Sequence, residues 1–206
     1  LSAELFLGHV RQVPPDFSWE LSFDTVARAI EATGPSAPGP DGVPYGAWSH
    51  ANLDCQGVLF RLLNDTLTSA AALPDQFNHS HLIFIPKGDD VSEHQAIGRA
   101  AGDFRPLNLC NTDNKLISLA LNDRLSALCQ TTVAAQQRGF VAGRHIEDNL
   151  FSLEAAAVSM SATNLKRAAT VLFDFCTAFP SLAHAWIFMV LAAMHIPCGF
   201  IGAIRQ

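Results

Sequence analysis

A single carboxylate interrupts an apolar, strand-forming run in the stretch Val171-Leu172-Phe173-Asp174-Phe175-Cys176-Thr177-Ala178-Phe179. The β-branched and aromatic residues of this stretch favour a buried strand. Burying Asp174 there is costly unless a metal ion, a helix N-terminus or an arginine compensates its charge. On this pattern alone the plainer interpretation is a strand-end aspartate that caps the following helix. The choice between a charge-compensated buried aspartate and a helix cap depends on the rest of the chain.

The composition indicates one ordinary core, or one domain of two lobes, with few charges. The chain has 206 residues, of which 49% are hydrophobic and 16% are charged, and its formal net charge is −6. Charged residues usually make up about a quarter of a soluble domain. Nucleic-acid binders usually carry a basic patch, so this acidic balance counts against a nucleic-acid partner.

The cysteines indicate the compartment. They are five, widely spaced, and none forms a Cys-x-x-Cys pair. This predicts reduced thiols in an intracellular protein, in the cytoplasm or the nucleus, and not a secreted one. The histidines show no zinc-ligand spacing. The longest apolar run, Ala185 to Met194, is too short to span a bilayer, so we expect no membrane partner. Because the chain begins at Leu1 rather than Met, we expect a fragment.

Hydrophobic spacing and turn residues predict the elements after an irregular lead-in over residues 1–21. Helices are expected around Val26–Ile30, over Val58–Ala70, over Thr112–Leu128, over Ile146–Met160, and from a cap at Ser181 to Pro197. Strands are expected over His81–Ile85 and around Asp174, with a short extended piece at Phe104–Leu107. The strands are too few for a doubly wound sheet. We therefore predict an α+β fold in which helices pack on a small antiparallel sheet.

Four local clusters occur in a fixed order along the chain. They are Ala37-Pro38-Gly39-Pro40-Asp41-Gly42-Val43-Pro44; Ile83-Phe84-Ile85-Pro86-Lys87-Gly88 with Phe104-Arg105-Pro106-Leu107-Asn108-Leu109; Gln137-Arg138-Gly139-Phe140-Val141-Ala142-Gly143-Arg144 with Asp148-Asn149; and Phe173-Asp174-Phe175 with Ala178-Phe179. The first, a run of turn residues, is read as either a linker or a rigid loop. Together the clusters resemble the fingers and palm of the reverse transcriptases of non-LTR (LINE-type) retrotransposons and their group II intron relatives.

The resemblance covers about residues 20 to 200 and implies an RNA-directed DNA polymerase. Its reaction is the transfer of a deoxynucleotide from a deoxynucleoside triphosphate to the 3′-hydroxyl of a DNA primer on an RNA template. The implied cofactor is Mg²⁺, with Mn²⁺ as an alternative. The implied architecture is an incomplete right-hand polymerase fold, with residues 22–165 as the fingers and residues 166–206 as the start of the palm.

The resemblance also implies roles for individual residues. Asp174 matches the first catalytic aspartate of the family, a metal ligand, and nucleotide addition needs divalent ions that clamp the reacting oxygens. Lys87 and Arg105 match fingers residues that contact the incoming triphosphate; arginine offers a bidentate fork and lysine a point charge. Without the resemblance, Lys87 and Arg105 would be read as ordinary solvated surface.

Two further sets of residues match the family. Phe179, five residues after Asp174, matches the aromatic gate that packs under the sugar and excludes a 2′-hydroxyl; the alternative is a core phenylalanine at a helix start. The loop and helix start that hold the template strand are matched by Gln137, Gly139, Phe140 and Arg144. The loop Gly39–Gly42 matches a structural element of the fingers and not a catalytic one.

The chain also departs from the family. The family's Lys-Ala-Phe-Asp is here Thr177-Ala178-Phe179-Pro180, and the chain ends at Gln206, before the Ala-Asp-Asp hairpin that supplies the remaining metal carboxylates. We therefore expect residues 1–206 taken alone to be inactive. Two rival interpretations stay open: a non-catalytic remnant that folds or binds RNA without chemistry, and an unrelated α+β domain.

Overall fold

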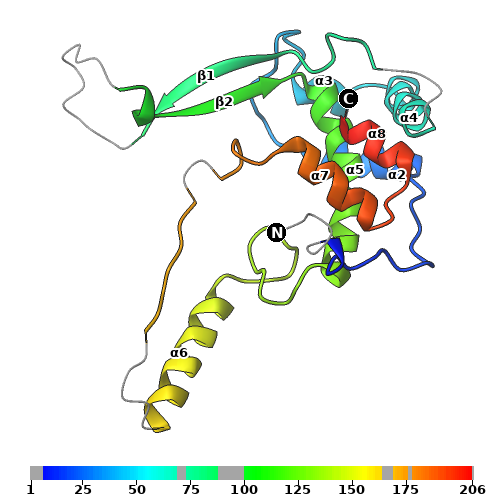
Figure 1. Ribbon diagram of the computed structural model, residues 1–206. Coiled ribbons are helices and arrows are strands. Elements are labelled where there is room, and N and C mark those ends of the chain that lie inside the picture. The colour runs from blue at the N-terminus through cyan, green and yellow to red at the C-terminus, as the bar shows by residue number, and fades with distance from the viewer. Residues whose placement is uncertain (1–6, 69–72, 88–99, 164–168, 176–177, 206) are drawn as a thin grey trace. The chain divides into compact units, whose positions relative to one another are not determined.

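In the computed structural model, the chain is described at residues 7–68, 73–87, 100–163, 169–175 and 178–205 (Figure 1). Its contacts divide it into two compact units. Unit 1 comprises Leu1–Trp19 and Asp123–Ile201, and unit 2 comprises Glu20–Asn122 and Gly202–Gln206. Over the described residues the fold is α+β: helices of 5 to 21 residues accompany one two-stranded antiparallel sheet. This confirms the predicted fold class.

Three helices open unit 2: α2 (Phe23–Glu31), α3 (Tyr45–Ser49) and α4 (Leu53–Leu67). The apolar positions of α2 and α4 recur at helical spacing, so each helix has one buried face. The buried side chains are Val26, Ala29, Ile30, Leu59 and Leu63. Asn52 caps α4, because its side-chain oxygen accepts a hydrogen bond from the Cys55 backbone N–H at 3.0 Å. Both predicted helices are confirmed.

The segment from Gly39 to Val43 is a fastened loop and not a linker. Gly42 has φ +72°, a conformation that glycine adopts without strain. The Asp41 carboxylate accepts a hydrogen bond from the Val43 N–H at 3.0 Å, and the Asp41 N–H donates to the Asn111 side chain at 3.2 Å. The second of these bonds ties the loop to Asn111, which lies seventy positions after Asp41 in the chain.

Thr112 fastens the same loop from its other end. Its hydroxyl, which is fully buried, donates to the Val43 carbonyl at 2.9 Å and accepts from the Trp48 indole N–H at 2.8 Å. The hydroxyl therefore uses both its donor and an acceptor site, as a buried polar group should. Of the two interpretations from sequence, the rigid loop is the one the structure supports.

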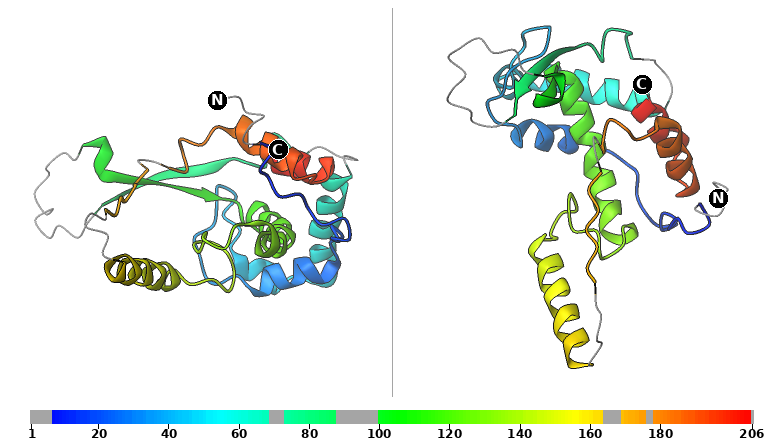
Figure 2. Two further views of the ribbon diagram at one scale, coloured as in Figure 1. Left: turned by 60° about the horizontal axis from the view of Figure 1, so that its bottom comes forward. Right: turned by 60° about the vertical axis from the view of Figure 1, so that its left-hand side comes forward.

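Strands β1 (Ser80–Pro86) and β2 (Phe104–Cys110) form an antiparallel ribbon, which the left view of Figure 2 displays along its length. The register pairs Ser80 with Cys110 at one end and Pro86 with Phe104 at the other. The 3₁₀ turn η2 (Ala101–Asp103) precedes β2. The apolar side chains of the ribbon are largely exposed, among them Leu82, Ile83, Phe84, Ile85 and Leu107. The first strand is confirmed, and the extended piece after Phe104 is a full strand.

Helix α5 (Thr112–Thr132) follows the ribbon directly. Its apolar side chains are buried in unit 2 at Leu116, Ile117, Ala120 and Leu121, and in unit 1 at Leu128. Asn114 in its first turn donates to the Phe77 carbonyl at 3.1 Å and to the Asn78 side chain at 2.7 Å. These two bonds hold the segment before β1 against the start of α5.

Asp113, in the first turn of α5, is predicted to lower stability at neutral pH. Burial is the largest effect and raises the pKa of its carboxyl; the hydrogen bond from the Asn114 N–H opposes this rise, and the nearby Asp41 adds a smaller upward effect. A carboxyl whose pKa is raised by folding contributes less stability as pH rises above its unfolded value, about 3.9. Asp113→Asn keeps an acceptor for the Asn114 N–H, which the Asp113 carboxylate binds at 2.7 Å.

The variant Asp113→Asn should therefore be more stable than the parent at pH 7, and its advantage should shrink as pH falls towards 4. Urea unfolding at several pH values measures both quantities. If the difference in unfolding free energy between variant and parent does not change with pH, or if the variant is less stable at pH 7, the ionised carboxylate of Asp113 is not what lowers stability.

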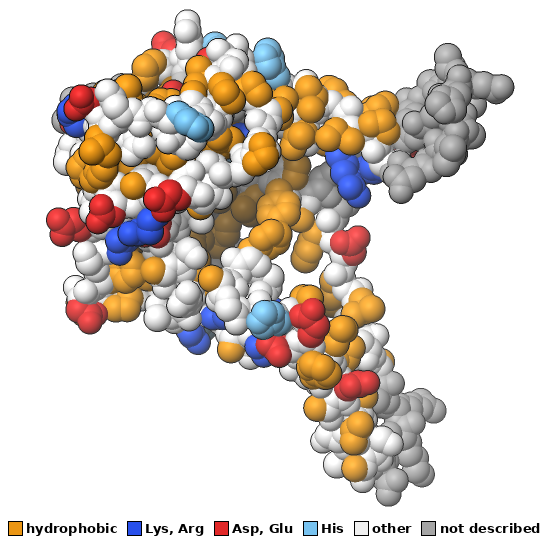
Figure 3. All heavy atoms as spheres, turned by 180° about the vertical axis from the view of Figure 1, so that it is seen from behind, with side chains coloured by type: hydrophobic (Ala, Val, Ile, Leu, Met, Phe, Trp, Pro, Cys, Tyr) orange, Lys and Arg blue, Asp and Glu red, His pale blue; other side chains and the backbone are white. Residues whose placement is uncertain are grey.

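Unit 1 holds α6 (Glu147–Ala162), α7 (His184–Ala193) and the first residues of α8 (Cys198–Arg205). The described lead-in is fastened to this unit: the Trp19 ring lies 4.7 Å from Phe200, and the Val13 N–H donates to the Met194 carbonyl at 2.9 Å. Among the described residues, α6 has no buried side chain, and its Leu150, Phe151 and Val158 are more than half exposed. Figure 3 shows hydrophobic side chains over this helix, at the lower right.

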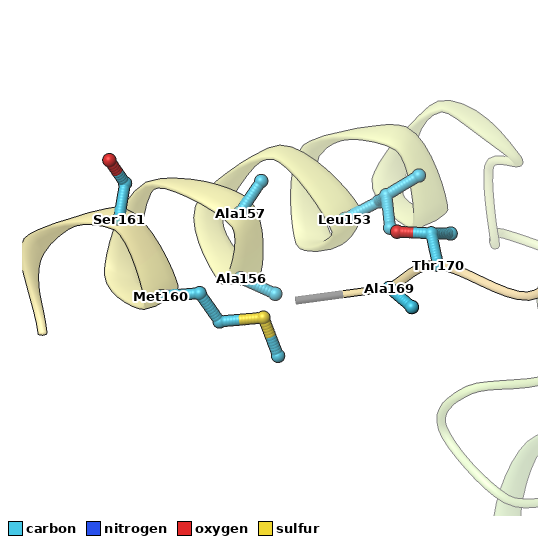
Figure 4. Close-up of a pocket in the computed structure, with 7 residues that line it drawn as sticks. All are labelled: Leu153, Ala156, Ala157, Met160, Ser161, Ala169 and Thr170. Carbon is cyan, nitrogen blue, oxygen red and sulfur yellow. The ribbon is translucent and has the colours of Figure 1, made fainter. Parts of the chain in front are cut away.

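A groove of about 490 Å³ lies between α6 and the segment that returns from it. Leu153, Ala156 and Met160 face Ala169 and Thr170 across it (Figure 4). Its lining is mostly apolar, with hydroxyls from Ser161 and Thr170. In the part of the chain that the structure describes, no helix combines the length and apolar character needed to cross a membrane.

Two predictions around Asp174 are wrong. Residues 171–175 are not a strand, and Val171, Leu172, Phe173 and Phe175 are 66–86% exposed. A strand needs a neighbour to satisfy its backbone groups, and none of the described residues pairs with this segment. Ser181 is not a helix cap either, because α7 is preceded by Ala183 and the Ser181 hydroxyl donates to the Ala178 carbonyl at 3.1 Å. Helix α8 was not predicted from the sequence.

Candidate active site

Lys87 and Arg105 lie on one face of the β1–β2 ribbon in unit 2. The register places Arg105 opposite Ile85. Lys87 continues the pairing by one position, since its N–H donates to the Asp103 carbonyl at 2.7 Å. Side chains two residues apart on a strand share a face, so Ile85, Lys87 and Arg105 project to the same side. The two cations that the sequence singled out therefore lie on the same side of the ribbon.

These two cations differ in what holds them. The Lys87 ammonium donates to the Gly102 carbonyl at 2.7 Å. An ammonium is a point charge that carries three donors. Arg105 is exposed, and no described residue forms a hydrogen bond or an ion pair with its guanidinium. An exposed fork of this kind is suited to bind phosphate oxygens in pairs.

Asp174 lies in unit 1, exposed, in the extended segment 169–175. It caps none of the described helices, since α7, the next described helix, is capped by Ala183, so the cap interpretation from the sequence does not apply. Within the described ranges, no three or more His, Cys, Asp or Glu side chains are grouped so that they could hold a metal ion. The described residues thus supply a candidate ligand but do not by themselves fit a complete magnesium site.

Phe179 lies in the turn before α7 and is 79% exposed, so it is not a core residue. Its ring meets the ring of Phe140 edge to face, with centroids 6.0 Å apart and planes at 85°. Phe140 belongs to the predicted template loop. The structure therefore brings together two residues, thirty-nine positions apart in sequence, that were singled out for different roles.

Arg144 closes the C-terminal end of α5. One terminal nitrogen, Nη1, donates to the carbonyls of Ala134 and Gln137, at 2.6 and 2.8 Å. The other, Nη2, donates to the carbonyls of Val133 and Gln130, at 3.0 and 3.3 Å. The last carbonyls of a helix lack partners within the helix and carry partial negative charge. A planar cation with several donors satisfies them, and a lysine could not reach them all.

Two more contacts shape the loop that Arg144 fastens. The Gln137 side chain donates to the Gly139 carbonyl at 2.9 Å. Arg138 forms an ion pair with Asp148 at 3.0 Å, which ties the loop to the first turn of α6. The sequence reasoning assigned no role to Arg138 or Asp148. Their ten-residue separation gives no periodic signal, so the pair could be found only from the fold.

Replacing Arg144 by alanine should destabilise the protein by about 2–4 kcal/mol, because the carbonyls at and just beyond the end of α5 lose a charged donor. Arg144→Lys should recover only part of that loss. Urea unfolding compares these variants with Arg205→Lys, a matched change in the last turn of α8. If the unfolding free energy of Arg144→Ala lies within about 0.5 kcal/mol of the parent value, the hydrogen bonds from Arg144 to the four carbonyls do not contribute to stability.

The residues singled out by sequence thus form two groups. Lys87 and Arg105 lie in unit 2, while Asp174, Phe179 and the template loop lie in unit 1. The fastened loop after Gly39 also lies in unit 2 and ends against the junction of β2 and α5. Each group is well defined within its own unit.

Comparison with known proteins identifies the family of the chain. The family described as reverse transcriptase (RNA-dependent DNA polymerase) matches residues 85–205, a range that contains Lys87, Arg105, the template loop, Asp174 and Phe179. The chain is also similar to the Retrovirus-related Pol polyprotein from type-2 retrotransposable element R2DM of Drosophila melanogaster, with 26% identity over 188 residues. That alignment covers 91% of this chain and 16% of the relative, so the chain spans a small part of the relative's length. The chain belongs to the reverse transcriptase family, as a reverse transcriptase domain of the non-LTR retrotransposon type.

Proposed function

We propose that this chain is part of an RNA-directed DNA polymerase that copies an RNA template onto a DNA primer. The reaction transfers a deoxynucleotide from its triphosphate to the primer 3′-hydroxyl. In this proposal residues 22–165 act as fingers and residues 166–206 begin the palm. Residues 1–206 contain no Ala-Asp-Asp sequence, so on their own they would not extend a primer.

The observation that carries the proposal is the position of Lys87 and Arg105 on one face of the ribbon. Charge builds on the triphosphate oxygens during transfer, and positioned cations stabilise that charge. A two-stranded ribbon holds the spacing of two side chains on one face more firmly than a loop does. Ribbon pairing also continues to Lys87, so its backbone is fixed beside the strand that carries Arg105.

Asp174 is proposed as a metal ligand of the polymerase. Reverse transcriptases in general use divalent metal ions, and Mg²⁺ with Mn²⁺ as an alternative is the cofactor proposed here. When bound, such ions would clamp the attacking and leaving oxygens. The exposed Asp174 carboxylate is accessible to an ion in water. Because Mg²⁺ binds weakly to a single carboxylate, the proposal requires further ligands outside the described residues.

The remaining residues are proposed to select the sugar and hold the template. Phe179 presents an exposed ring five positions after Asp174, which supports a contact with the nucleotide sugar. Gln137, Gly139 and Phe140 form the loop proposed to contact the template strand. Both terminal nitrogens of Arg144 donate hydrogen bonds to backbone carbonyls, four in all. We therefore propose that it serves template binding by fixing this loop rather than by touching RNA.

The test is the response of nucleotide use to Arg105. The protein used is translated from the whole open reading frame that encodes residues 1–206. Arg105→Ala should lower kcat/KM for deoxynucleoside triphosphates by a factor that corresponds to about 1–3 kcal/mol of transition-state stabilisation, the scale for losing a charge-assisted contact. The template affinity should change much less. Arg61→Ala, which removes an exposed arginine from α4, is the matched control.

Equal kcat/KM for Arg105→Ala and the parent would assign Arg105 to ordinary surface and overturn its proposed role. Failure of the parent to extend any primer would instead favour the rival function, a non-catalytic remnant that folds or binds RNA.

A further inference from the structure

The contact between Phe140 and Phe179 joins two regions of unit 1. Their rings meet edge to face at 6.0 Å, an arrangement that aromatic pairs prefer. Both rings are otherwise surrounded by solvent, since Phe140 is 97% exposed and Phe179 is 79% exposed. Neither ring is held by burial in a core. Each is therefore the other's identified aromatic neighbour among the described residues.

The backbone of Phe140 is strained. Its φ is +60°, in the left-handed region that residues other than glycine, asparagine and aspartate rarely adopt. Strain of this kind persists only where the surrounding structure enforces it, and it gathers at functional sites. Here the enforcement is visible: Arg144 holds four carbonyls before the loop closes, and Gln137 holds the Gly139 carbonyl.

We propose that Phe140 is a positioning residue for sugar selection, acting through Phe179. This inference rests on the proposed function and deepens it, because it names the group that fixes the gate. A ring that excludes a single 2′-hydroxyl must hold its place, and an exposed ring in a turn has several accessible rotamers. The ring of Phe140 restricts Phe179 from one side. The fastened template loop thereby sets the discrimination between ribo- and deoxyribonucleotides.

The experiment measures the ratio of kcat/KM for UTP to that for dTTP on a poly(rA) template with an oligo(dT) primer. It uses the protein translated from the whole open reading frame. Phe140→Leu removes the aromatic ring and should raise the ratio about 2- to 10-fold, the range available to one ring pair. Phe179→Val should raise it at least as much, and the double variant should gain no more than Phe179→Val alone. Phe140→Tyr should restore the parent ratio.

Phe151→Leu on α6 is the matched control, since it also replaces an exposed phenylalanine of unit 1; its ratio should equal that of the parent. Template affinity is measured in parallel by anisotropy with labelled RNA. An unchanged ratio for Phe140→Leu, with or without weaker RNA binding, would overturn the inference while leaving the polymerase assignment in place. An additive double variant would overturn it too, because the two rings would then act separately. A parent that incorporates neither nucleotide would overturn the proposed function, and the inference with it.

Discussion

Replacing Asp174 by asparagine should lower primer extension by at least about 100-fold while leaving the fold intact. Asparagine keeps the size of the side chain but removes the charge that a divalent ion requires. Because Asp174 is exposed and lies in an extended segment, the substitution removes no packing. The measurement is the initial rate of deoxynucleotide incorporation by the protein from the whole open reading frame.

Asp16→Asn is the matched control for this prediction. Asp16 is likewise an exposed aspartate of unit 1 outside helices and strands, so it reports any general effect of losing one negative charge. Circular dichroism and urea unfolding should be the same for both variants and the parent. Near-normal extension by Asp174→Asn would remove the assignment of Asp174 as a metal ligand.

Replacing Gly39 by alanine should destabilise unit 2 by about 2–3 kcal/mol, the usual cost of forcing an extra carbon into a packed site. Gly39 is buried, and a β-carbon there would overlap the backbone nitrogen and the side-chain oxygen of Asn111. Backbone cannot give way as a flexible side chain can. Asn111 also accepts the hydrogen bond from Asp41, so displacing it would loosen the whole loop.

Gly57→Ala is the contrasting control. Gly57 lies within α4, and beyond its chain neighbours and the nearby helix backbone nothing lies within 4 Å of the β-carbon it would gain. Alanine in a helix interior is favoured over glycine, so this variant should be stabilised by about 0.5–1 kcal/mol. Urea unfolding of the two variants should give shifts of opposite sign. Equal shifts would show that the close approach of Gly39 to Asn111 is not what limits substitution there.

Local patterns predicted the helices well, and the physics explains why. In α4, Leu59 and Leu63 are four residues apart and both are buried, so the spacing in the sequence already contained the packed face. The start of α5 at Thr112 was also foreseen. Each of these elements satisfies its backbone hydrogen bonds within itself, so neighbouring sequence is enough to predict it.

A strand needs a neighbouring strand to pair with, and the segment around Asp174 has no such neighbour among the described residues. Val171 to Phe175 has strand-forming residues, yet the described structure leaves them unpaired and exposed. Strand propensity reports fit to a half-buried surface and not an intrinsic backbone preference. The described residues provide no sheet surface against which this segment could pack, so its strand propensity does not produce a strand. Helix α8 was missed for a different reason, since Pro197 was read only as an end and not as a start.

The candidate site was predictable in its residues but not in its arrangement. Motif order pointed to Lys87 and Arg105, but only the register that pairs Ile85 with Arg105 puts them on one face. The cage of carbonyls around Arg144 depends on how the chain turns after α5. The contact of Phe140 with Phe179 likewise depends on the tertiary fold. Such distances are set by packing between segments that are far apart in sequence.

The most direct test of the polymerase assignment is RNA-templated DNA synthesis. The protein from the whole open reading frame is incubated with a heteropolymeric RNA, an annealed DNA primer, all four deoxynucleoside triphosphates and Mg²⁺, and the products are sequenced. The assignment predicts DNA complementary to the RNA, synthesised by the parent and the Asp16→Asn control but not by Asp174→Asn. No product from the parent, or a product whose sequence does not follow the template, would contradict it.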